Sequence, residues 1–494
     1  MSNFYAALEV GTTRTVLAIG ETEDGGRLKI TCKAEIPSTG VRKSQILDIA
    51  QATQSIKSVL QKIERQQAEG GTKVTIGNAF LAVSGQHVKS SSAVGTTPVE
   101  GSRVTDDDLN AVLASARSGA ALSKGRELLD IVDQDYVLDD RGGISAPKGM
   151  SGRVLRLNTI HIHADRNRIH DARTAAEAAH LEIREPRFAT TCAADAVLED
   201  HEKKNGVLVL DLGGGSTGYA FYADGYVVTT GVIGVGGDHV TNDIAHAFQT
   251  TNAQAETLKT AFASAVIRPV DGEAARVKVE RGENSLMDTR TISRRALDTV
   301  VNARLLELFT VIRETLEDQD ILHRLHSGVV LVGGGARMRE IDTLAEQVLG
   351  ANVRIGRPIH VDGLDNEEFP AAYATVAGAL LYAHRNYEEK SILDGLFGRF
   401  FKSTATRPFF SSASARPALA SPAASAAPSA KAFATFSPTR MRPPDSSEAP
   451  LRFLAATASP AAAPAATSAP GAWPSKTPSV RLTNTWKASA SPLS

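Results

Sequence analysis

The chain has very few cysteines and no long hydrophobic run. Only two of its 494 residues are cysteine, Cys32 and Cys192, and they stand in unrelated sequence contexts. This count argues against a disulfide framework and fits a reducing cytosol. No stretch of about 18 apolar residues occurs, so the sequence predicts no membrane-spanning helix. The first five residues contain no basic leader, and we therefore expect no signal peptide.

The chain as a whole also lacks a strong net charge, but its two parts differ. The formal net charge is −1. Residues 402–494 hold ten Lys or Arg side chains and two acids, which leaves 44 basic and 53 acidic side chains in residues 1–401. An acidic body argues against nucleic-acid binding, whereas the basic tail leaves an anionic partner open. Beyond residue 404, Ala, Pro, Ser and Thr dominate, and so little apolar surface predicts disorder.

Two Gly-rich turns, 202 positions apart, share one arrangement of residues. In the first, an apolar strand ends in Glu9 and residues 11–13 read Gly-Thr-Thr; in the second, Asp211 precedes Gly-Gly-Gly-Ser-Thr at residues 213–217. Glycine lets the backbone turn sharply and bring its N–H groups close to a phosphate. The hydroxyls add donors, and a carboxylate at the strand end can hold Mg²⁺ through water. One such turn is more often a plain β-turn, but two copies predict related subdomains that close on one nucleoside triphosphate.

A third Gly-rich turn, residues 333–335, follows the apolar run at residues 329–332. Alone it could be a simple strand-to-helix corner, or a place where the backbone lies flush against a purine or ribose. The three turns in this order resemble the actin/Hsp70/hexokinase superfamily of nucleotide-binding proteins. Within it, residues 5–402 are similar to the bacterial cell-division actin FtsA. The resemblance implies an α/β, actin-like fold of two related nucleotide-clasping halves, with a small α+β insertion subdomain in the first half.

Other segments extend the resemblance beyond the turns. Residues 80–95 and 105–109 are similar to the insertion subdomain, and residues 234–244 to a Gly-Gly-x-x-(Ile/Val)-Thr-x-Asp segment of the family. Glu256 and Lys259 match a family helix that faces the ribose and base, although a Lys three positions after a Glu is also an ordinary solvated pair. ATP and Mg²⁺ are the implied cofactors. The implied nucleotide-binding residues are Gly11, Thr12, Thr13, Gly213, Gly214, Gly215, Ser216, Thr217, Gly236, Gly237, Glu256, Lys259, Gly333, Gly334, Gly335 and Arg337.

Two departures bear on the chemistry. Glu9 and Asp211 are the candidates to hold Mg²⁺ through water and for any catalytic role, but proteins of this kind usually carry Asp at the first position. Gly218 stands where they usually carry a second carboxylate. Mg²⁺ tolerates poor geometry badly, and hydrolysis needs metal and water placed accurately. We therefore predict nucleotide binding with weak or absent ATPase activity.

The resemblance also divides the chain into parts. Residues 1–80 and 165–204 form the first half, residues 81–164 the insertion, and residues 205–250 and 325–388 the second half. Residues 251–324 form a smaller subdomain of that half, residues 390–403 an amphipathic helix, and residues 404–494 the tail. Apolar periodicity predicts helices over residues 45–67, 167–202, 238–248, 253–264, 292–317, 338–349 and 370–385.

The segment at residues 391–402 places its apolar side chains on one half of a helix and its polar residues on the other. Such a helix lies in a membrane interface, where its cations favour anionic lipid. The alternative is a last core helix that packs on its own domain. FtsA-like proteins carry a helix of this kind at the extreme C-terminus, whereas here a tail follows it. The candidate membrane residues are Ile392, Leu393, Leu396, Phe397, Arg399, Phe400, Phe401 and Lys402.

A partner surface is implied on the helix at residues 293–308, which resembles the FtsA helix that docks the C-terminal peptide of the tubulin-like FtsZ. Arg304, Glu307 and the nearby Arg295 are the candidates, and a solvated pair is the alternative for Arg304 and Glu307.

The leading hypothesis is an ATP-binding cell-division protein that polymerises on the cytoplasmic face of the inner membrane and tethers FtsZ there, beside other divisome proteins. An actin-fold scaffold of pilus or secretion assembly is a second hypothesis. A third is a superfamily phosphotransferase or phosphatase, for which Asp195 is the one candidate base.

Overall fold

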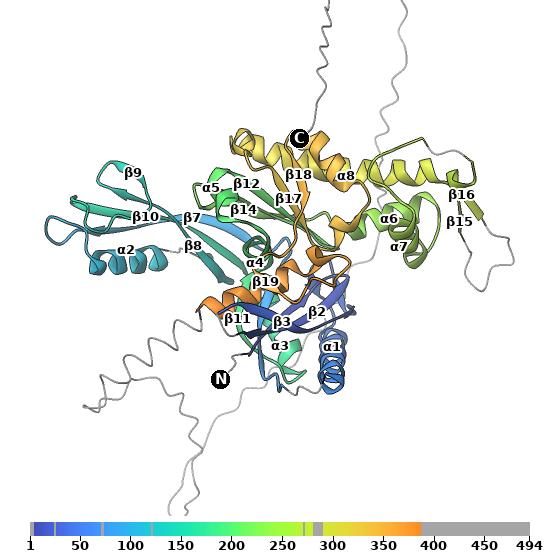
Figure 1. The fold of residues 1–494 in the computed structure, drawn as a ribbon, viewed down its shortest axis with the longest axis horizontal. Helices are drawn as coiled ribbons and strands as arrows, with labels where there is room; N and C mark the ends of the chain where they lie inside the picture. The colour runs from blue at the N-terminus through green and yellow to red at the C-terminus, as the bar shows by residue number, and fades with distance from the viewer. Residues whose placement is uncertain are drawn as a thin grey trace, which may run out of the picture. The chain divides into compact units, whose positions relative to one another are not determined.

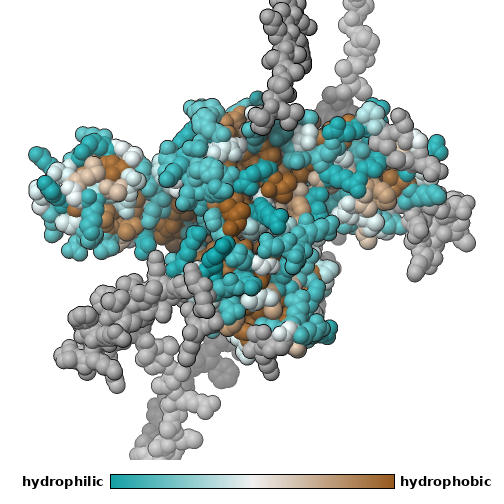
Figure 2. Space-filling model, viewed as in Figure 1, coloured by the Kyte–Doolittle hydropathy of each residue, from teal (hydrophilic) through white to brown (hydrophobic). Residues whose placement is uncertain are grey.

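The computed structural model describes residues 4–23, 26–70, 74–119, 122–269, 272–279 and 290–386 (Figure 1). The amphipathic segment at residues 391–402 and the tail lie outside these ranges. No helix among the described residues is long and apolar enough to cross a membrane. Figure 2 shows the surface of this part as mostly hydrophilic in this view, with hydrophobic residues in separate places.

Two mixed sheets repeat one strand arrangement. The first has the order β11-β6-β1-β2-β3-β19, and the second, taken in the same direction, β18-β17-β12-β13-β14. In each, three consecutive strands pair antiparallel, and two later strands add in parallel beside the first of them. The first sheet comprises β1 (Phe4–Val10), β2 (Arg14–Thr22), β3 (Leu28–Pro37), β6 (Asn78–Val83), β11 (Glu182–Phe188) and β19 (Val361–Asp362). The second comprises β12 (Val207–Leu212), β13 (Thr217–Ala223), β14 (Tyr226–Ile233), β17 (Val329–Val332) and β18 (Val353–Ile355).

The second sheet is buried on both faces. Successive side chains of a strand point to opposite sides, and alternate side chains of β12 enter two different cores. Val207 and Val209 of β12 pack into the hydrophobic core of the first half, whereas Leu208 and Leu210 pack into a second core. The first core also takes in helices α1 (Ile49–Glu69), α3 (Arg166–Glu177) and α4 (Ala189–Val197), and the helical residues 374–386. The second core takes in α6 (Gly237–Ala247), α7 (Asn252–Ala261), α8 (Arg294–Asp318) and α9 (Ile341–Leu349).

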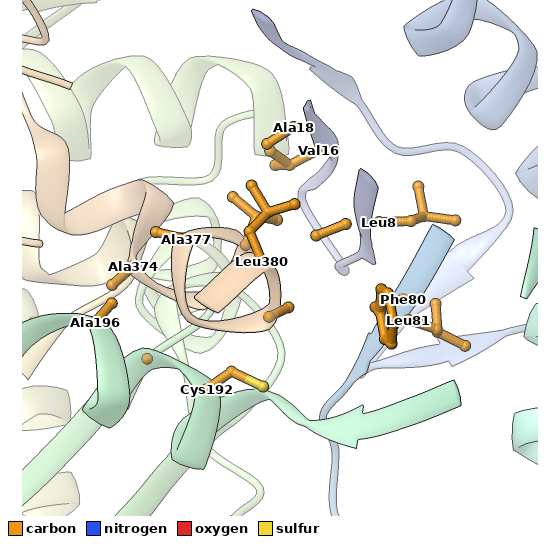
Figure 3. Packing of buried hydrophobic residues seen from close by; sticks show 14 of the residues in the cluster. Leu8, Val16, Ala18, Phe80, Leu81, Cys192, Ala196, Ala374, Ala377 and Leu380 are labelled. Atoms are coloured by element: carbon orange, nitrogen blue, oxygen red, sulfur yellow. The ribbon is translucent and has the colours of Figure 1, made fainter. Parts of the chain in front are cut away.

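The last helical segment, residues 374–386, crosses α4 at very short range. A methyl group added at Gly378 would lie 1.6 Å from the carbonyl oxygen of Cys192, so only glycine permits this approach. Figure 3 shows Ala374, Ala377 and Leu380 of this segment in one buried hydrophobic cluster with Ala196 and Cys192. Small side chains on both helices therefore hold the C-terminal part of the described chain against the first half. Both Cys192, which is buried, and Cys32 are free thiols.

A separate sheet with the order β7-β10-β8-β9 carries one helix, α2 (Asp106–Ser118), and lies to the left in Figure 1. Thr105 caps that helix: its N–H donates to Asp108 Oδ2 at 2.8 Å, and the Asp108 N–H donates to Thr105 Oγ1 at 3.3 Å. Gly95 lets the helix lie on β7, because a methyl group there would be 2.4 Å from the Val112 carbonyl oxygen. The strands are β7 (Lys89–Pro98), β8 (Arg126–Leu138), β9 (Arg141–Ile144) and β10 (Val154–Asp165).

Several helix predictions were wrong in part. Residues 262–264 follow the end of α7, residues 292–293 belong to a strand, and residues 370–373 form a 3₁₀ turn. Residues 45–48 do not begin a helix: β4 (Val41–Arg42) and β5 (Gln45–Ile46) form a hairpin, and Asp48 caps α1. Residues 167–202 are not one helix, because β11 lies between α3 and α4, and α5 (Asp200–Asn205) is separate. Pro186 is tolerated in β11 since that strand is at the edge of its sheet. Residues 338–340 precede α9, and Glu340 has a left-handed φ of 56°.

Short elements complete the described chain. They are the 3₁₀ turns η1 (Gly272–Ala275), η2 (Leu322–Arg324), η3 (Gly334–Arg337) and η4 (Pro370–Tyr373), and the strands β15 (Arg276–Val279) and β16 (Arg290–Ser293).

Candidate functional site

The duplicated turns face a single cavity of about 290 Å³. Its wall is built from the end of β1 and the turn after it, the end of β12 and the turn after it, the start of α6, one side of α7 and the turn after β17. These segments are far apart in sequence. The equivalent ends of the two repeated sheets bring them together.

The two turns have the same hydrogen bond at the same position. The Gly11 N–H donates to the Arg14 carbonyl oxygen at 3.0 Å, and the Gly213 N–H donates to the Ser216 carbonyl oxygen at 3.0 Å. A methyl group would come within 2.9 Å of the accepting oxygen at Gly11 and within 2.8 Å at Gly213. Both turns therefore require glycine for the same steric reason.

Glu9 and Asp211 hold corresponding places in β1 and β12, and both carboxylates line the cavity. Burial raises the pKa of Glu9 to about 7; the Arg14 guanidinium opposes this shift, and the Asp211 and Glu35 carboxylates add to it. Burial also raises the pKa of Asp211 to about 6, against Arg14 and a hydrogen bond with Thr375. Two neighbouring carboxyl groups with raised pKa values mark a place where a cation would stabilise the charged form.

The start of α6 lies directly on the second turn. The Gly237 N–H donates to the Gly213 carbonyl oxygen at 3.0 Å, and the Asp238 N–H to the Gly214 carbonyl oxygen at 2.8 Å. A methyl group at Gly236 would lie 2.5 Å and 2.6 Å from the same two oxygens. Glycine at this position therefore lets two backbone segments touch and leaves the cavity open between them.

Glu256 and Lys259 of α7 reach the cavity through one shared network. Lys259 Nζ lies 2.7 Å from Glu256 Oε2, donates to Thr241 Oγ1 at 2.8 Å and to the Gly237 carbonyl oxygen at 3.2 Å. The Thr241 hydroxyl in turn donates to Glu256 Oε2 at 2.5 Å. The pair is therefore not an ordinary solvated helix pair, because it also connects α7 to the glycine end of α6.

The third turn closes the cavity opposite the first. Gly333 has a φ of +82°, and a methyl group there would lie 2.6 Å from Asp211 Oδ1. Arg337, at the end of η3, lies with its guanidinium carbon 5.1 Å from the centre of the Phe369 ring, so the cation is held over an aromatic face.

All but one of the predicted nucleotide-binding residues line this cavity. The exception is Gly215, where a methyl group would meet Thr12 Oγ1 at 2.5 Å and the Ser44 backbone nitrogen at 2.9 Å. Several polar residues that were not predicted from the sequence also line the cavity, among them Arg14, Glu35, Ser44, Asp238 and Thr375.

Arg14 is the most consequential of these omissions. Its guanidinium donates to Glu35 Oε2 at 2.6 Å and to the Ala372 carbonyl oxygen, and it lies 5.5 Å from the centre of the Tyr373 ring. Its place directly after the first turn is the feature of the sequence that could have identified it. Its partners, by contrast, come from residues more than 20 and more than 350 positions away.

The candidate partner residues on α8 differ in their surroundings. Arg304 makes two hydrogen bonds to Asp243 of α6, at 2.6 and 3.0 Å, and also pairs with Glu307. Arg295 and Glu307 are exposed. Asp195, the candidate base of the phosphotransferase hypothesis, pairs with Lys203 at 3.0 Å and does not line the cavity.

Comparison with known proteins identifies the family. A family model described as cell division protein FtsA matches residues 208–378, and one described as the SHS2 domain inserted in FtsA matches residues 85–163. The cell division protein FtsA of Pseudomonas aeruginosa is 32% identical over 377 residues, which cover 76% of this chain and 88% of that protein. The chain belongs to the FtsA family. FtsA of Escherichia coli K12 is 29% identical over 387 residues, covering 77% of this chain and 90% of its own.

A solved structure with this fold is the PilM–PilN type IV pilus biogenesis complex. Its TM-score is 0.53 at 17% identity, over 77% of this chain and 98% of that one. This likeness concerns the fold alone, so the FtsA relationship decides between the hypotheses. The chain is an actin-like cell-division protein, with an actin-like nucleotide-binding fold and an FtsA-type insertion, as the resemblance predicted.

Proposed function

We propose that this FtsA-family protein binds ATP with Mg²⁺ in the cavity between its two repeated sheets. The observation that carries the proposal is the pair of equivalent turns, Gly11 and Gly213, whose strands each end in a carboxylate facing the same cavity. The residues fit the ligand. Glycines at the contacts between turns leave room that a Cβ would fill, and the raised pKa values of Glu9 and Asp211 favour a cation beside them.

Each group has a defined role in this proposal. Glu9 and Asp211 would hold Mg²⁺, which neutralises phosphate charge when bound. Backbone N–H groups and hydroxyls of the two turns would bind the phosphates, since such donors form anion-binding concavities. Glu256, Lys259 and the turn after β17 would hold the ribose and base. Since Gly218 supplies no second carboxylate after Asp211, we propose that hydrolysis is weak or absent.

The protein acts, in this proposal, as a membrane adaptor. Nucleotide joins the two halves and favours a form that polymerises with further copies of itself. Residues 392–402 bind anionic lipid on the cytoplasmic face of the inner membrane at the division site. The α8 surface, with Arg295 and Glu307 exposed and Arg304 beside them, binds the C-terminal peptide of FtsZ, and other divisome proteins join there.

Liposome co-sedimentation of the intact protein with ATP tests the adaptor role. The full chain should pellet with vesicles that contain anionic lipid and should carry an FtsZ C-terminal peptide with it. A Phe397→Glu, Phe400→Glu double variant should stay in the supernatant, because burying charge in the interface is costly. An Arg416→Ala, Arg440→Ala variant in the tail, which lowers the net charge by the same two units, controls for the change in overall charge. Equal pelleting of the intact protein and the double variant would contradict the proposed anchor.

A further inference from the structure

The tip of the β4–β5 hairpin lies at the end of the cavity where the two Gly-rich turns meet. Its two tip residues, Lys43 and Ser44, have left-handed φ values of 50° and 57°. Two-residue hairpins of this form need positive φ at both positions, and Asn-Gly or Gly-Gly suits them far better than Lys-Ser. Ser44 nevertheless lines the cavity. The chain therefore places a side chain with a hydroxyl where the backbone alone would favour glycine.

Ser44 connects the two repeated turns. Its backbone N–H donates to Thr12 Oγ1 at 2.8 Å, and its own Oγ lies 3.1 Å from Ser216 Oγ and 3.4 Å from Thr12 Oγ1. Thr12 belongs to the first half and Ser216 to the second. Ser44 thus lies where the two halves meet.

The surrounding backbone holds Ser44 in this place. A methyl group at Gly85 would be 2.9 Å from Ser44 Cβ, and one at Gly215 would be 2.9 Å from the Ser44 nitrogen. At the base of the hairpin, the Leu47 and Asp48 N–H groups donate to the Gly40 carbonyl oxygen at 2.8 and 3.1 Å. The hairpin is therefore fixed at its base on the start of α1 and confined at its tip by two glycines.

Three hydroxyls from three segments converge here, and each can rotate its hydrogen toward an anion. They lie where the turns that would bind the phosphates meet, so they fit the oxygens of a terminal phosphate. We propose that Ser44 donates its hydroxyl to the terminal phosphate of a bound nucleoside triphosphate, which makes the β4–β5 hairpin a sensor that distinguishes triphosphate from diphosphate. This inference rests on the proposed nucleotide site. With a diphosphate, Ser44 keeps the bonds to Thr12 and Ser216 described above.

Equilibrium binding of AMPPNP and ADP, each with Mg²⁺, to the full chain tests the inference. The variants are Ser44→Ala, which removes the hydroxyl, and Ser44→Gly, which also relieves the turn. The control is Thr39→Ala, which removes a hydroxyl bonded to Gln51 and Ser55 at the base of the same hairpin. Because hydrogen bonds to charged groups are strong, we expect both Ser44 variants to lose about tenfold or more in AMPPNP affinity and little in ADP affinity. Thr39→Ala should keep the ratio of AMPPNP to ADP affinity that the unaltered chain shows.

The paired variants separate phosphate binding from turn stability. A purely structural role would make Ser44→Gly bind nucleotide better than Ser44→Ala, because glycine relieves the positive φ, whereas alanine, like serine, carries a Cβ. It would also change AMPPNP and ADP affinity equally. Either of these two patterns would overturn the inference while leaving the nucleotide site intact. A ratio of AMPPNP to ADP affinity that is unchanged in both variants would do the same. No binding of either nucleotide by the unaltered chain would instead overturn the proposed function, and this inference with it.

Discussion

Gly11 and Gly213 make the same turn in two different sheets. Each N–H donates at 3.0 Å to the carbonyl oxygen three residues later, and each glycine follows, by two residues, a carboxylate that lines the cavity. Both turns open on one cavity, so the repeat of the fold places equivalent groups at one site.

Replacing Gly213 by alanine should disrupt the second turn. The added methyl group would lie 2.8 Å from the Ser216 carbonyl oxygen, so the backbone must move and the phosphate donors with it. We expect ATP affinity to fall by about tenfold or more in equilibrium titration. Gly77→Ala is the matched control, because no atom lies within 4 Å of its added methyl group. Equal ATP affinity in the two variants would contradict the assigned role of the turn.

The pH dependence of stability should report on the buried acids. Burial raises the pKa of Asp211 from 3.8 to about 6, so the folded protein keeps this proton to a higher pH than the unfolded chain does. The free energy of unfolding therefore falls as pH rises from about 4 to about 6, and the loss is complete above that range.

Asp211→Asn removes this contribution. Without nucleotide or Mg²⁺, its stability relative to the unaltered chain should rise between pH 4 and 7, by on the order of 2 kcal/mol. Chemical denaturation at a series of pH values measures the difference. A difference that stays constant with pH would show that Asp211 does not carry a raised pKa.

Arg304→Ala should weaken the contact between α8 and α6. It leaves Asp243 without the two hydrogen bonds that now hold it, and we expect the free energy of unfolding to fall by about 1 kcal/mol, since both side chains are partly exposed.

Arg295→Glu lies on the exposed surface and should leave the thermal unfolding midpoint unchanged while reducing affinity for the FtsZ peptide. If Arg295→Glu binds the peptide like the unaltered chain, α8 is not the docking surface proposed here.

Gly378→Ala should destabilise the fold strongly. Its methyl group would overlap the Cys192 carbonyl oxygen, so residues 374–386 and α4 must separate, at a cost of about 3 kcal/mol or more. Gly70→Ala, at the end of α1, is the control, because its nearest neighbour is 3.4 Å away. Thermal unfolding compares the two. A midpoint for Gly378→Ala equal to that of the control would mean that the two helices do not cross as described.

Local sequence patterns predicted the parts of the site that depend on local chemistry. The carboxylates at the ends of β1 and β12 and the glycines beside them are features of short segments. The hairpin that carries Ser44 was mistaken for the start of a helix, because its apolar residues, such as Ile46, continue the periodicity of α1.

Residues that act through long-range contacts could not be found in this way. Arg14 meets Ala372 because the chain returns to the first half next to residues 374–386, which follow the second half in the sequence. The strand β11 was hidden for a similar reason. Its residues are neither strongly apolar nor alternating, and they form a strand because β6 offers an edge to pair with.

Calorimetric titration of the full chain with ATP and Mg²⁺ tests the central claim most directly. If the two turns close on one ligand, the titration should show one nucleotide bound per chain. No binding, or two independent sites per chain, would contradict the account, because two sites would mean that each turn binds its own nucleotide.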